Sequence, residues 1–358
     1  MPDLLHREDM DNARERLTTW WNGGDIGRPA MQITARRNEP REDIPRMSEP
    51  DGWVTHYSTS DFAYRVHLAL RACNSTEYYA EATPNVSPDL APNCLALYLG
   101  CQGVEMPGTV WCEPCIEAPD DARFDYDEDN AYWRFTLRLA RECLSLGAGK
   151  FLMAFPDLIE GLDTLAAMRG TEALLEDLLQ RPQWVHDALG QITDRYFRHY
   201  DILYDMFRDE VGGSVFWAWA PGRMTKLQCD FSAMISPEMF GEFMVPVLRQ
   251  MTERVSYSMY HWDGPGALEH HDHLLSLERL TMLQWTPGAG AEPTDHPRWW
   301  PYYHTTFDAG KRVLISCAGA DSLRAMKREF GARLNSFLIN MTAASRAEAE
   351  ELMEVAGA

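Results

Sequence analysis

Hydrophobic and polar positions alternate in blocks along most of the chain. Short apolar runs such as KFLMAFPDL, SVFWAWAPG and RVLISCAG end at Pro, Asp or Gly, which is typical of buried strands. Longer segments between them carry apolar residues at spacings of three and four, as in residues 131–147, and this spacing predicts helices. Strands and helices that alternate in this way predict an α/β protein with a parallel sheet.

The number of strand candidates indicates the architecture. About eight lie between residues 76 and 342, so we expect a single (β/α)8 TIM-type barrel with an N-terminal helical extension. Residues 1–75 would form the helical extension and a loop that pack on the barrel, and residues 76–358 the barrel itself. A doubly wound sheet is the alternative, but no strand is followed by a Gly-x-Gly-x-x-Gly or Gly-Lys-Ser/Thr phosphate loop.

Composition and charge narrow the classes of partner. The chain has 358 residues, 45% of them hydrophobic, which is enough for a large core. A net charge of −21 disfavours binding to nucleic acid or to an anionic membrane, so we expect a small-molecule substrate. The N-terminal residues are polar and no apolar run reaches the ~18 residues of a membrane span, so we expect a cytoplasmic protein, with a homodimer left open.

Cysteine usage is that of a reducing compartment. A chain of this size with eight cysteines is expected to hold thiols rather than a disulfide framework. Cys112 and Cys115 form a single Cys-x-x-Cys with a proline between them, and no second pair accompanies it. We therefore expect a structural or accidental role for this pair rather than a redox or metal-binding role.

Two strand ends carry residues that can bind a metal ion. His261 and Asp263 stand two apart before a Gly-Pro-Gly stop, so their side chains leave the strand on the same face. Cys317 ends a later apolar run and is followed by Ala-Gly. Imidazole, carboxylate and thiolate together could hold a metal with one open position. The alternative is that His261 is an ordinary strand-end histidine and Cys317 a buried thiol.

In a barrel the C-terminal ends of the strands form the mouth of the active site. The polar or small residues expected there are Asp157, Asp230, His261, Asp263, Gln284, Cys317 and Thr342. The substrate pocket is predicted to comprise Trp111, Trp217, Trp219, Gln284 and Trp285, because a dry aromatic lining suits a small organic molecule. Packing inside the barrel is the alternative role for these tryptophans.

Two acidic residues and three histidines complete the candidate set. Asp157 and Glu81 are candidates for acid–base catalysis or ligand orientation, with capping or surface roles as alternatives. His270, His271 and His273 lie on the predicted helix after His261; one of them could support the site, but we expect mainly a solvated face.

Several segments together resemble the uroporphyrinogen decarboxylase superfamily. The resemblance rests on RERLTTWWNGGDIGRPAM, FLMAFPDLIEGLDTLAAMRGTEALLEDLLQRPQWV, SAMISPEMFGEFMVPVLRQM, SMYHWDGPG, LISCAGADSL and SFLINMTAAS. It covers about residues 10–345 and implies a barrel. The Arg-Gln-Ala-Gly-Arg loop that grips the carboxylates of tetrapyrroles is missing, since the corresponding region reads RPAMQITARRNEPRED. True uroporphyrinogen decarboxylation is therefore not expected.

The closer resemblance is to the zinc-dependent corrinoid and coenzyme M methyltransferases of that superfamily. Their zinc ligands are a His-x-Cys at one strand end and a cysteine at a later one. The resemblance implies that His261 matches the histidine and Cys317 the later cysteine, with Asp263 in the place of the first cysteine. This exchange makes the expected Zn²⁺ site harder, because a carboxylate replaces one thiolate ligand.

The resemblance implies a zinc-dependent methyltransferase or demethylase that acts on a small methylated organic substrate. The methyl group would pass to a corrinoid carried by a separate protein or to a thiol, and the harder ligand set favours the demethylating direction. One alternative is a metal-free decarboxylase or lyase of a small organic acid, with Asp263 or Asp157 as its charged group. A barrel that binds a small molecule without chemistry is the other.

Overall fold

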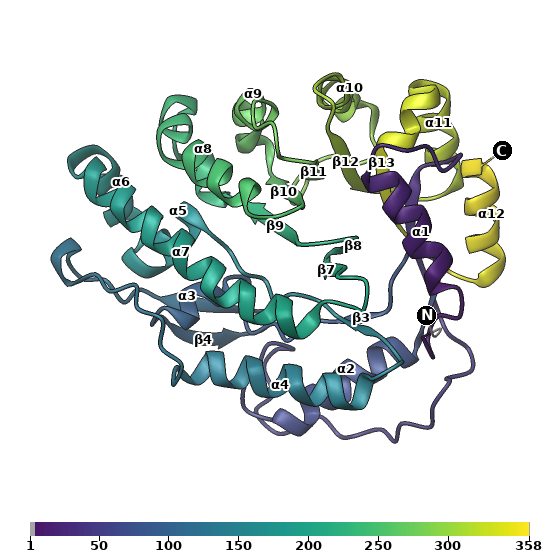
Figure 1. Ribbon diagram of the computed structural model, residues 1–358, viewed down its shortest axis with the longest axis horizontal. Helices are drawn as coiled ribbons and strands as arrows, with labels where there is room; N and C mark the ends of the chain where they lie inside the picture. The colour runs from purple at the N-terminus through teal and green to yellow at the C-terminus, as the bar shows by residue number, and fades with distance from the viewer. Residues whose placement is uncertain (1–3, 358) are drawn as a thin grey trace.

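The computed structural model of the protein describes residues 4–357, with strands on the inside and helices around them (Figure 1). The strands are β1 (Ala30–Arg36), β2 (Thr76–Ala80), β3 (Asn85–Val86), β4 (Gln102–Met106), β5 (Thr109–Glu113), β6 (Leu152–Met153), β7 (Ser214–Phe216), β8 (Ala218–Ala220), β9 (Met224–Gln228), β10 (Tyr257–Asp263), β11 (Met282–Thr286), β12 (Arg312–Ser316) and β13 (Phe337–Ala343).

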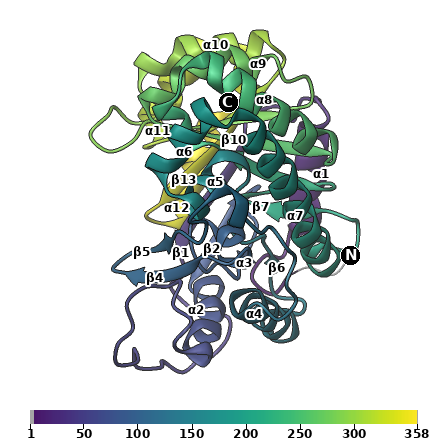
Figure 2. The same cartoon turned by 90° about the vertical axis from the view of Figure 1, so that its left-hand side faces the viewer.

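Most of the helices cover the outside of these strands. They are α1 (Met10–Trp21), α2 (Phe62–Asn74), α3 (Cys94–Tyr98), α4 (Ala131–Gly147), α5 (Gly161–Arg169), α6 (Thr171–Gln180), α7 (Pro182–Phe207), α8 (Pro237–Glu253), α9 (His271–Leu275), α10 (Trp300–Asp308), α11 (Ala320–Phe330) and α12 (Arg346–Gly357). Helices α2 and α4 lie on one side of the molecule and α8 to α10 on the opposite side (Figures 1 and 2). The short 3-10 turns that matter below are η2 (Asp230–Met234) and η3 (Pro265–His270).

The central sheet has seven strands in the order β2-β1-β13-β12-β11-β10-β9. All neighbouring pairs in it are parallel except β1 with β2. The arc continues through the parallel pair β3–β6 and a parallel bridge between Ala154 and Val215 at β7. The α/β prediction is therefore confirmed, and the arrangement is consistent with a TIM-type barrel, although the hydrogen-bonded sheet does not close into a ring.

The segment predicted as the N-terminal extension contributes a strand to this sheet. Residues 30–36 form β1, which runs parallel to β13, with Gln32 opposite Asn340 and Thr34 opposite Thr342. An early and a late segment of the chain are therefore neighbours in the seven-stranded sheet. The division of the chain at residue 75 stays a prediction.

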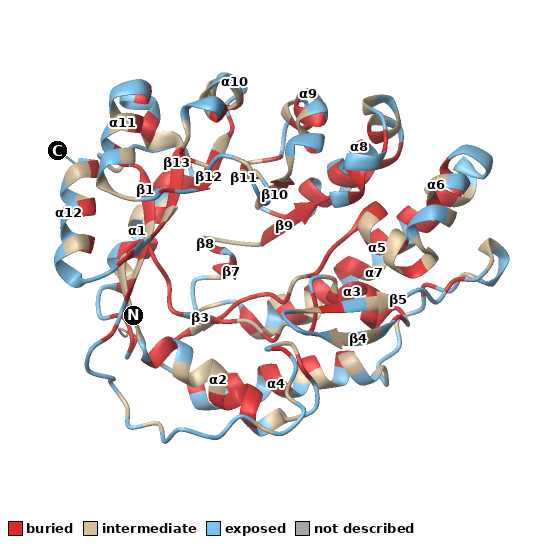
Figure 3. Cartoon of the chain, turned by 180° about the vertical axis from the view of Figure 1, so that it is seen from behind, coloured by how far each residue is buried: buried red, intermediate tan, exposed pale blue. Residues whose placement is uncertain are grey.

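Local sequence signals explain where the main helices begin. Helix α4 occupies residues 131–147 as its spacing predicts, and the Asn130 side chain accepts a hydrogen bond from the Trp133 amide at 3.0 Å. Helix α8 follows a Ser236 cap and has Pro237 at its first position, where a missing N–H costs nothing. Buried residues follow the strands and the inward faces of the helices (Figure 3). No helix within residues 4–357 is long and apolar enough to cross a membrane.

Candidate active site

The register of strands β9, β10 and β11 places Gln228, His261 and Gln284 side by side. In the parallel β9-β10-β11 segment, His261 is paired with Gln228 on one side and with Gln284 on the other. Asp263, two residues farther along β10, is paired with Thr286, and Asp230 stands two residues beyond Gln228. Because residues two apart share a face, a second polar layer lies at the C-terminal ends of these strands.

Asp230, His261 and Asp263 converge on one point. Each offers one ligand atom, and these three atoms all lie within 4.8 Å of one another, an arrangement that no other group of His, Cys, Asp and Glu achieves within residues 4–357. The His261 Nε2 to Asp263 Oδ2 distance is 3.7 Å. In the same part of the chain, neither aspartate forms an ion pair with a lysine or arginine within 4.0 Å, so a divalent cation would neutralise both carboxylates.

Gln284 orients the His261 ring. Its amide nitrogen donates to Thr286 Oγ1 at 2.8 Å and to the Trp285 carbonyl at 3.0 Å, so its oxygen faces His261 Nδ1, which it contacts closely. From this network we assign the proton to Nδ1, which leaves the lone pair of Nε2 directed at the two carboxylates. A hydrogen bond from the other ring nitrogen is the usual support of a metal-binding histidine. The donor set therefore fits a metal ion.

Two carboxylates next to helix α5 hold the end of β9. Asp163 accepts hydrogen bonds from the backbone amides of Asp230 and Phe231, both at 2.8 Å. Glu160, which is fully buried, accepts one from the Gln228 amide at 2.9 Å. Burial raises the pKa of Glu160 to about 8. Asp230 is exposed at its surface, but partial desolvation of its carboxylate together with the charge of Asp163 raises its pKa to about 6. At neutral pH Glu160 is therefore protonated.

Lys226 supplies positive charge beneath these acids. Its side chain is completely buried on β9, and its amino group contacts both Asp157 and the Gln228 side-chain oxygen. The same amino group lies 4.9 Å from the centroid of the Trp217 ring. Asp157, a predicted acid–base residue, is thus the ion-pair partner of Lys226, and its catalytic role stays a prediction.

Trp217 lies at the tip of a tight turn beside His261. Strands β7 and β8 pair around it, and it adopts a φ of 63°, a strained conformation for a residue other than glycine. Its ring approaches His261 edge-on, with a centroid distance of 5.2 Å and an angle of 80°. Its carbonyl accepts from Gln32 Nε2 at 3.2 Å. The strained turn therefore holds an aromatic ring against the imidazole.

A cavity of about 500 Å³ opens where β1, β12 and β13 end. Gln32, Thr34, Asn340 and Thr342 line it from adjacent strands, and Gln32 donates to Asn340 Oδ1 at 2.8 Å. The remaining lining residues are Tyr78, Ala82, Thr83, Asn85, Ser316, Cys317, Ala318 and Met341. Amides and hydroxyls thus dominate this cavity, and its volume suits a small organic molecule.

Cys317 lines this cavity rather than joining Asp230, His261 and Asp263. Its thiol contacts the Gly319 carbonyl at 3.6 Å, and burial raises its pKa to about 12. Metal binding would require the thiolate, which this burial disfavours in the absence of a cation. Within residues 4–357, the structure groups His261 and Asp263 with Asp230, and metal binding by Cys317 stays a prediction.

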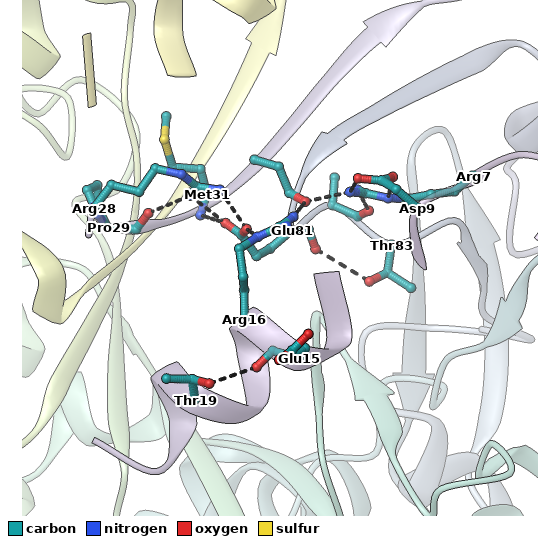
Figure 4. Close-up of polar contacts among 12 residues, drawn as sticks. Arg7, Asp9, Glu15, Arg16, Thr19, Arg28, Pro29, Met31, Glu81 and Thr83 are labelled. Carbon is teal, nitrogen blue, oxygen red and sulfur yellow. Dashed lines mark hydrogen bonds and ion pairs between the residues drawn. The ribbon is translucent and has the colours of Figure 1, made fainter. Parts of the chain in front are cut away.

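Glu81 lies in a clamp of arginines (Figure 4). Its Oε1 accepts from Arg16 at 2.6 Å and from Arg28 at 2.7 Å, and its Oε2 accepts from Arg28 and from the Met31 amide, both at 2.8 Å. Burial raises the pKa of Glu81, but hydrogen bonds and charge from Arg28 outweigh it, so the pKa is lowered. These contacts tie α1 and β1 together; the acid–base role of Glu81 stays a prediction.

The predicted pocket residues are found in three settings. Trp217 and Gln284 touch His261, as described above. Trp219 and Trp285 are 1% exposed: Trp219 donates to Asp209 at 2.8 Å, and Trp285 packs on neighbouring tryptophans. Trp111 lies on the β4–β5 hairpin and is 67% exposed. A substrate contact by any of these residues stays a prediction.

Sequence reasoning missed the acids and the lysine around β9. Asp230 was expected at the mouth but not as a ligand, and Lys226 and Glu160 were not singled out. The signal for Asp230 was its spacing of two from Gln228, which repeats that of His261 and Asp263. The expectation of a solvated histidine face is wrong for two of the three histidines. His270 and His271 are buried, and they contact the Ser232 carbonyl and the Thr306 hydroxyl at 2.9 Å each.

Comparison with known proteins gives a likeness in structure but none in sequence. No protein-family model matches the chain, and no curated protein matches it by sequence. Among solved structures, a methyltransferase from Methanosarcina mazei is similar, with a TM-score of 0.60 over 96% of this chain and 97% of that chain. The sequence identity is 11%, so the likeness shows a shared fold.

Proposed function

We propose that the protein is a metal-dependent methyltransferase or demethylase acting on a small methylated organic substrate. The observation that carries the proposal is the convergence of Asp230, His261 and Asp263 at the C-terminal ends of β9 and β10. The shared fold with a methyltransferase supports it, as does the resemblance of sequence segments to the methyltransferase branch of the uroporphyrinogen decarboxylase superfamily. In this proposal the C-terminal ends of the strands form the mouth of the active site, as they do in a (β/α)8 barrel.

The proposed metal ligands are His261 Nε2, Asp263 and Asp230, with Zn²⁺ as the expected ion. Cys317 is the alternative third ligand, which the resemblance implies. One nitrogen and two carboxylates form a harder donor set than one with thiolates. A bound Zn²⁺ would supply Lewis acidity toward the oxygen or nitrogen that carries the methyl group.

The side chains of the chain itself would bind the substrate and handle protons. The cavity beside Cys317 would receive the substrate through the amides of Gln32 and Asn340. Trp217 would exclude water from the imidazole side. Asp157, which pairs with the buried Lys226, is the acid–base candidate that would supply the proton taken up by the demethylated product. The methyl acceptor would be the Co(I) of a separate corrinoid protein, or a thiol.

A metal-free decarboxylase or lyase is the second candidate, because one observation favours it. The buried Glu160 and Lys226, the half-buried Asp163 and the exposed Asp230 form an acid–base cluster that needs no metal ion. In that reaction the substrate would lose carbon dioxide, and an acid of the cluster would protonate the resulting carbanion. Asp157 or Asp263 would then be the charged group near the substrate.

Methyl transfer to cob(I)alamin tests the proposal. Purified protein with Zn²⁺ is mixed with free or protein-bound Co(I) corrinoid and a panel of methyl ethers and methylamines, and methyl-Co(III) is followed by absorbance. We expect product with at least one substrate and a loss of at least 100-fold in His261→Ala, with the half-exposed His296→Gln as matched control. Carbon dioxide release from carboxylic acids without metal, and no methyl-Co(III), would contradict it.

A further inference from the structure

A third thiol joins the Cys-x-x-Cys pair in the folded protein. Cys101 precedes β4, and Cys112 lies on β5, which pairs with β4 so that Cys112 is opposite Gly103. The Cys101 and Cys115 sulfur atoms are 3.7 Å apart. Cys101 also interacts with the Cys112 thiol. The sequence alone shows an isolated Cys-x-x-Cys pair, because Cys101 lies eleven positions before Cys112.

Backbone contacts with helix α5 hold two of the three thiols in place. The amides of Cys115 and Ile116 both donate to the Met168 carbonyl at 2.8 Å, and the Cys101 thiol lies 3.5 Å from the Ala167 carbonyl. Cys101 is fully buried, Cys112 half-buried and Cys115 exposed. The group therefore has a buried base and an open side, through which an ion could enter.

From this geometry we propose that Cys101, Cys112 and Cys115 form a binding site for a thiophilic cation of the Zn²⁺ class. In a tetrahedral thiolate site, sulfur–metal bonds of ~2.3 Å place neighbouring sulfur atoms about 3.8 Å apart. The 3.7 Å separation of Cys101 and Cys115 matches such an edge. A disulfide would instead require these sulfur atoms to approach to about 2.05 Å.

The Cys112 side chain completes the site by a small movement. The three sulfur atoms do not all lie within 4.8 Å of one another, whereas the ligand atoms of the Asp230 group do, among the residues that the structure describes. Cys112 is half-buried at the edge of a two-stranded hairpin, so rotation about its Cα–Cβ bond is available. A water molecule would take the fourth position, as in three-ligand zinc sites.

Binding of a cation to this group would displace the protons of the three thiols. The net charge of −21 also favours cations near the surface of the protein.

Cobalt substitution tests this site independently of the proposed methyl transfer. The reduced, chelator-treated protein is titrated with Co²⁺ and then with Zn²⁺. We expect a near-ultraviolet thiolate-to-cobalt absorption that Zn²⁺ abolishes. The absorption should be lost in Cys112→Ser and in Cys115→Ser, which are half-buried and exposed and so are expected to fold. His261→Ala and Cys317→Ser are the matched controls, and both should keep the absorption.

Labelling of the thiols by a maleimide, followed by mass spectrometry, gives a second readout. Zn²⁺ should slow the labelling of Cys115 at least tenfold in the wild type but not in Cys112→Ser. The proposal is overturned if the wild type shows no thiolate absorption with Co²⁺, or if the absorption disappears only in Cys317→Ser. A Cys101–Cys115 disulfide in the isolated protein, with no metal bound after reduction, would also overturn it.

Discussion

At the scale of single residues, the site depends on how the partners of His261 direct its lone pair. The Gln284 oxygen accepts a hydrogen bond from His261 Nδ1–H, because the Gln284 amide nitrogen already donates to Thr286 and Trp285. Nε2 therefore faces Asp230 and Asp263 in the state that binds a metal. The sequence marked Gln284 as a pocket residue, and the structure gives it a contact with the imidazole that spacing alone does not reveal.

Replacement of Gln284 should weaken metal binding without removing a ligand. We expect Gln284→Leu to lower Zn²⁺ affinity about 10- to 100-fold, because Nδ1 loses its acceptor and the ring its orientation. Gln284→Glu keeps an oxygen acceptor for Nδ1–H, so it should bind Zn²⁺ at least tenfold more tightly than Gln284→Leu. Competition with a chromophoric chelator measures both affinities. Equal affinity in wild type and Gln284→Leu would contradict this role.

Glu160 should make stability depend on pH. Its pKa is raised from 4.5 to about 8 by burial, so between these values the folded protein holds a proton that the unfolded chain releases. Folding stability from this group is therefore present below about pH 4.5 and lost as pH rises toward 8. Glu160→Gln has no such group to ionise. Between pH 4.5 and pH 8, its free energy of unfolding should therefore rise relative to that of wild type by about 1.4 kcal/mol per pH unit.

Urea unfolding of both proteins at pH 5, 6, 7 and 8 measures this difference. The free energy of unfolding of Glu160→Gln should rise relative to that of wild type at each step from pH 5 to pH 8. A difference that is the same at all four values would show that Glu160 is ionised in the folded protein.

At the scale of secondary structure elements, prediction succeeded where hydrophobic spacing was regular. Helix α4 and the strand that carries His261 and Asp263 are where their patterns place them. Strand β9 was missed because Lys226 and Gln228 interrupt its apolar pattern, although all five of its residues are buried. Its polar residues are neutralised by tertiary partners, Asp157 among them, and a linear pattern does not contain that information.

Glu81 shows the same limit in another element. From the sequence, Glu81 is a candidate for acid–base catalysis, but two arginines from the N-terminal segment surround it. We expect Glu81→Gln to destabilise the protein by about 3 to 5 kcal/mol, because it leaves Arg16 and Arg28 without a buried counter-ion. Thermal unfolding measures this change.

The ion pairs of Glu81 also have a pH dependence of known sign. Because its pKa is lowered in the folded protein, the stabilisation it gives is present at neutral pH and is lost as the medium becomes acidic. Turnover per folded molecule should be unchanged in Glu81→Gln below its melting temperature. A stable variant without activity would instead support the acid–base role.

At the scale of the whole molecule, one helix lies between the two proposed metal sites. Helix α5 has Glu160 and Asp163 at its N-terminal end, where they hold β9, and near its other end its carbonyls contact Cys101 and Cys115. The overall α/β arrangement followed from the alternation of elements in the sequence. The meeting of Asp230 with His261 did not, because it depends on which strands become neighbours in the sheet.

Metal content of the purified protein tests the central claim most directly. Wild type, His261→Ala, Asp263→Asn and Asp230→Asn are dialysed against Zn²⁺ and then buffer, and zinc per chain is measured by mass spectrometry. Each variant should hold about one equivalent less than wild type, as ligand loss predicts, while the half-exposed control His296→Gln should match it. If Cys317→Ser loses that equivalent and Asp230→Asn keeps it, Cys317 is the third ligand. Equal zinc in wild type, His261→Ala and Asp263→Asn would contradict the metal site and the proposed function.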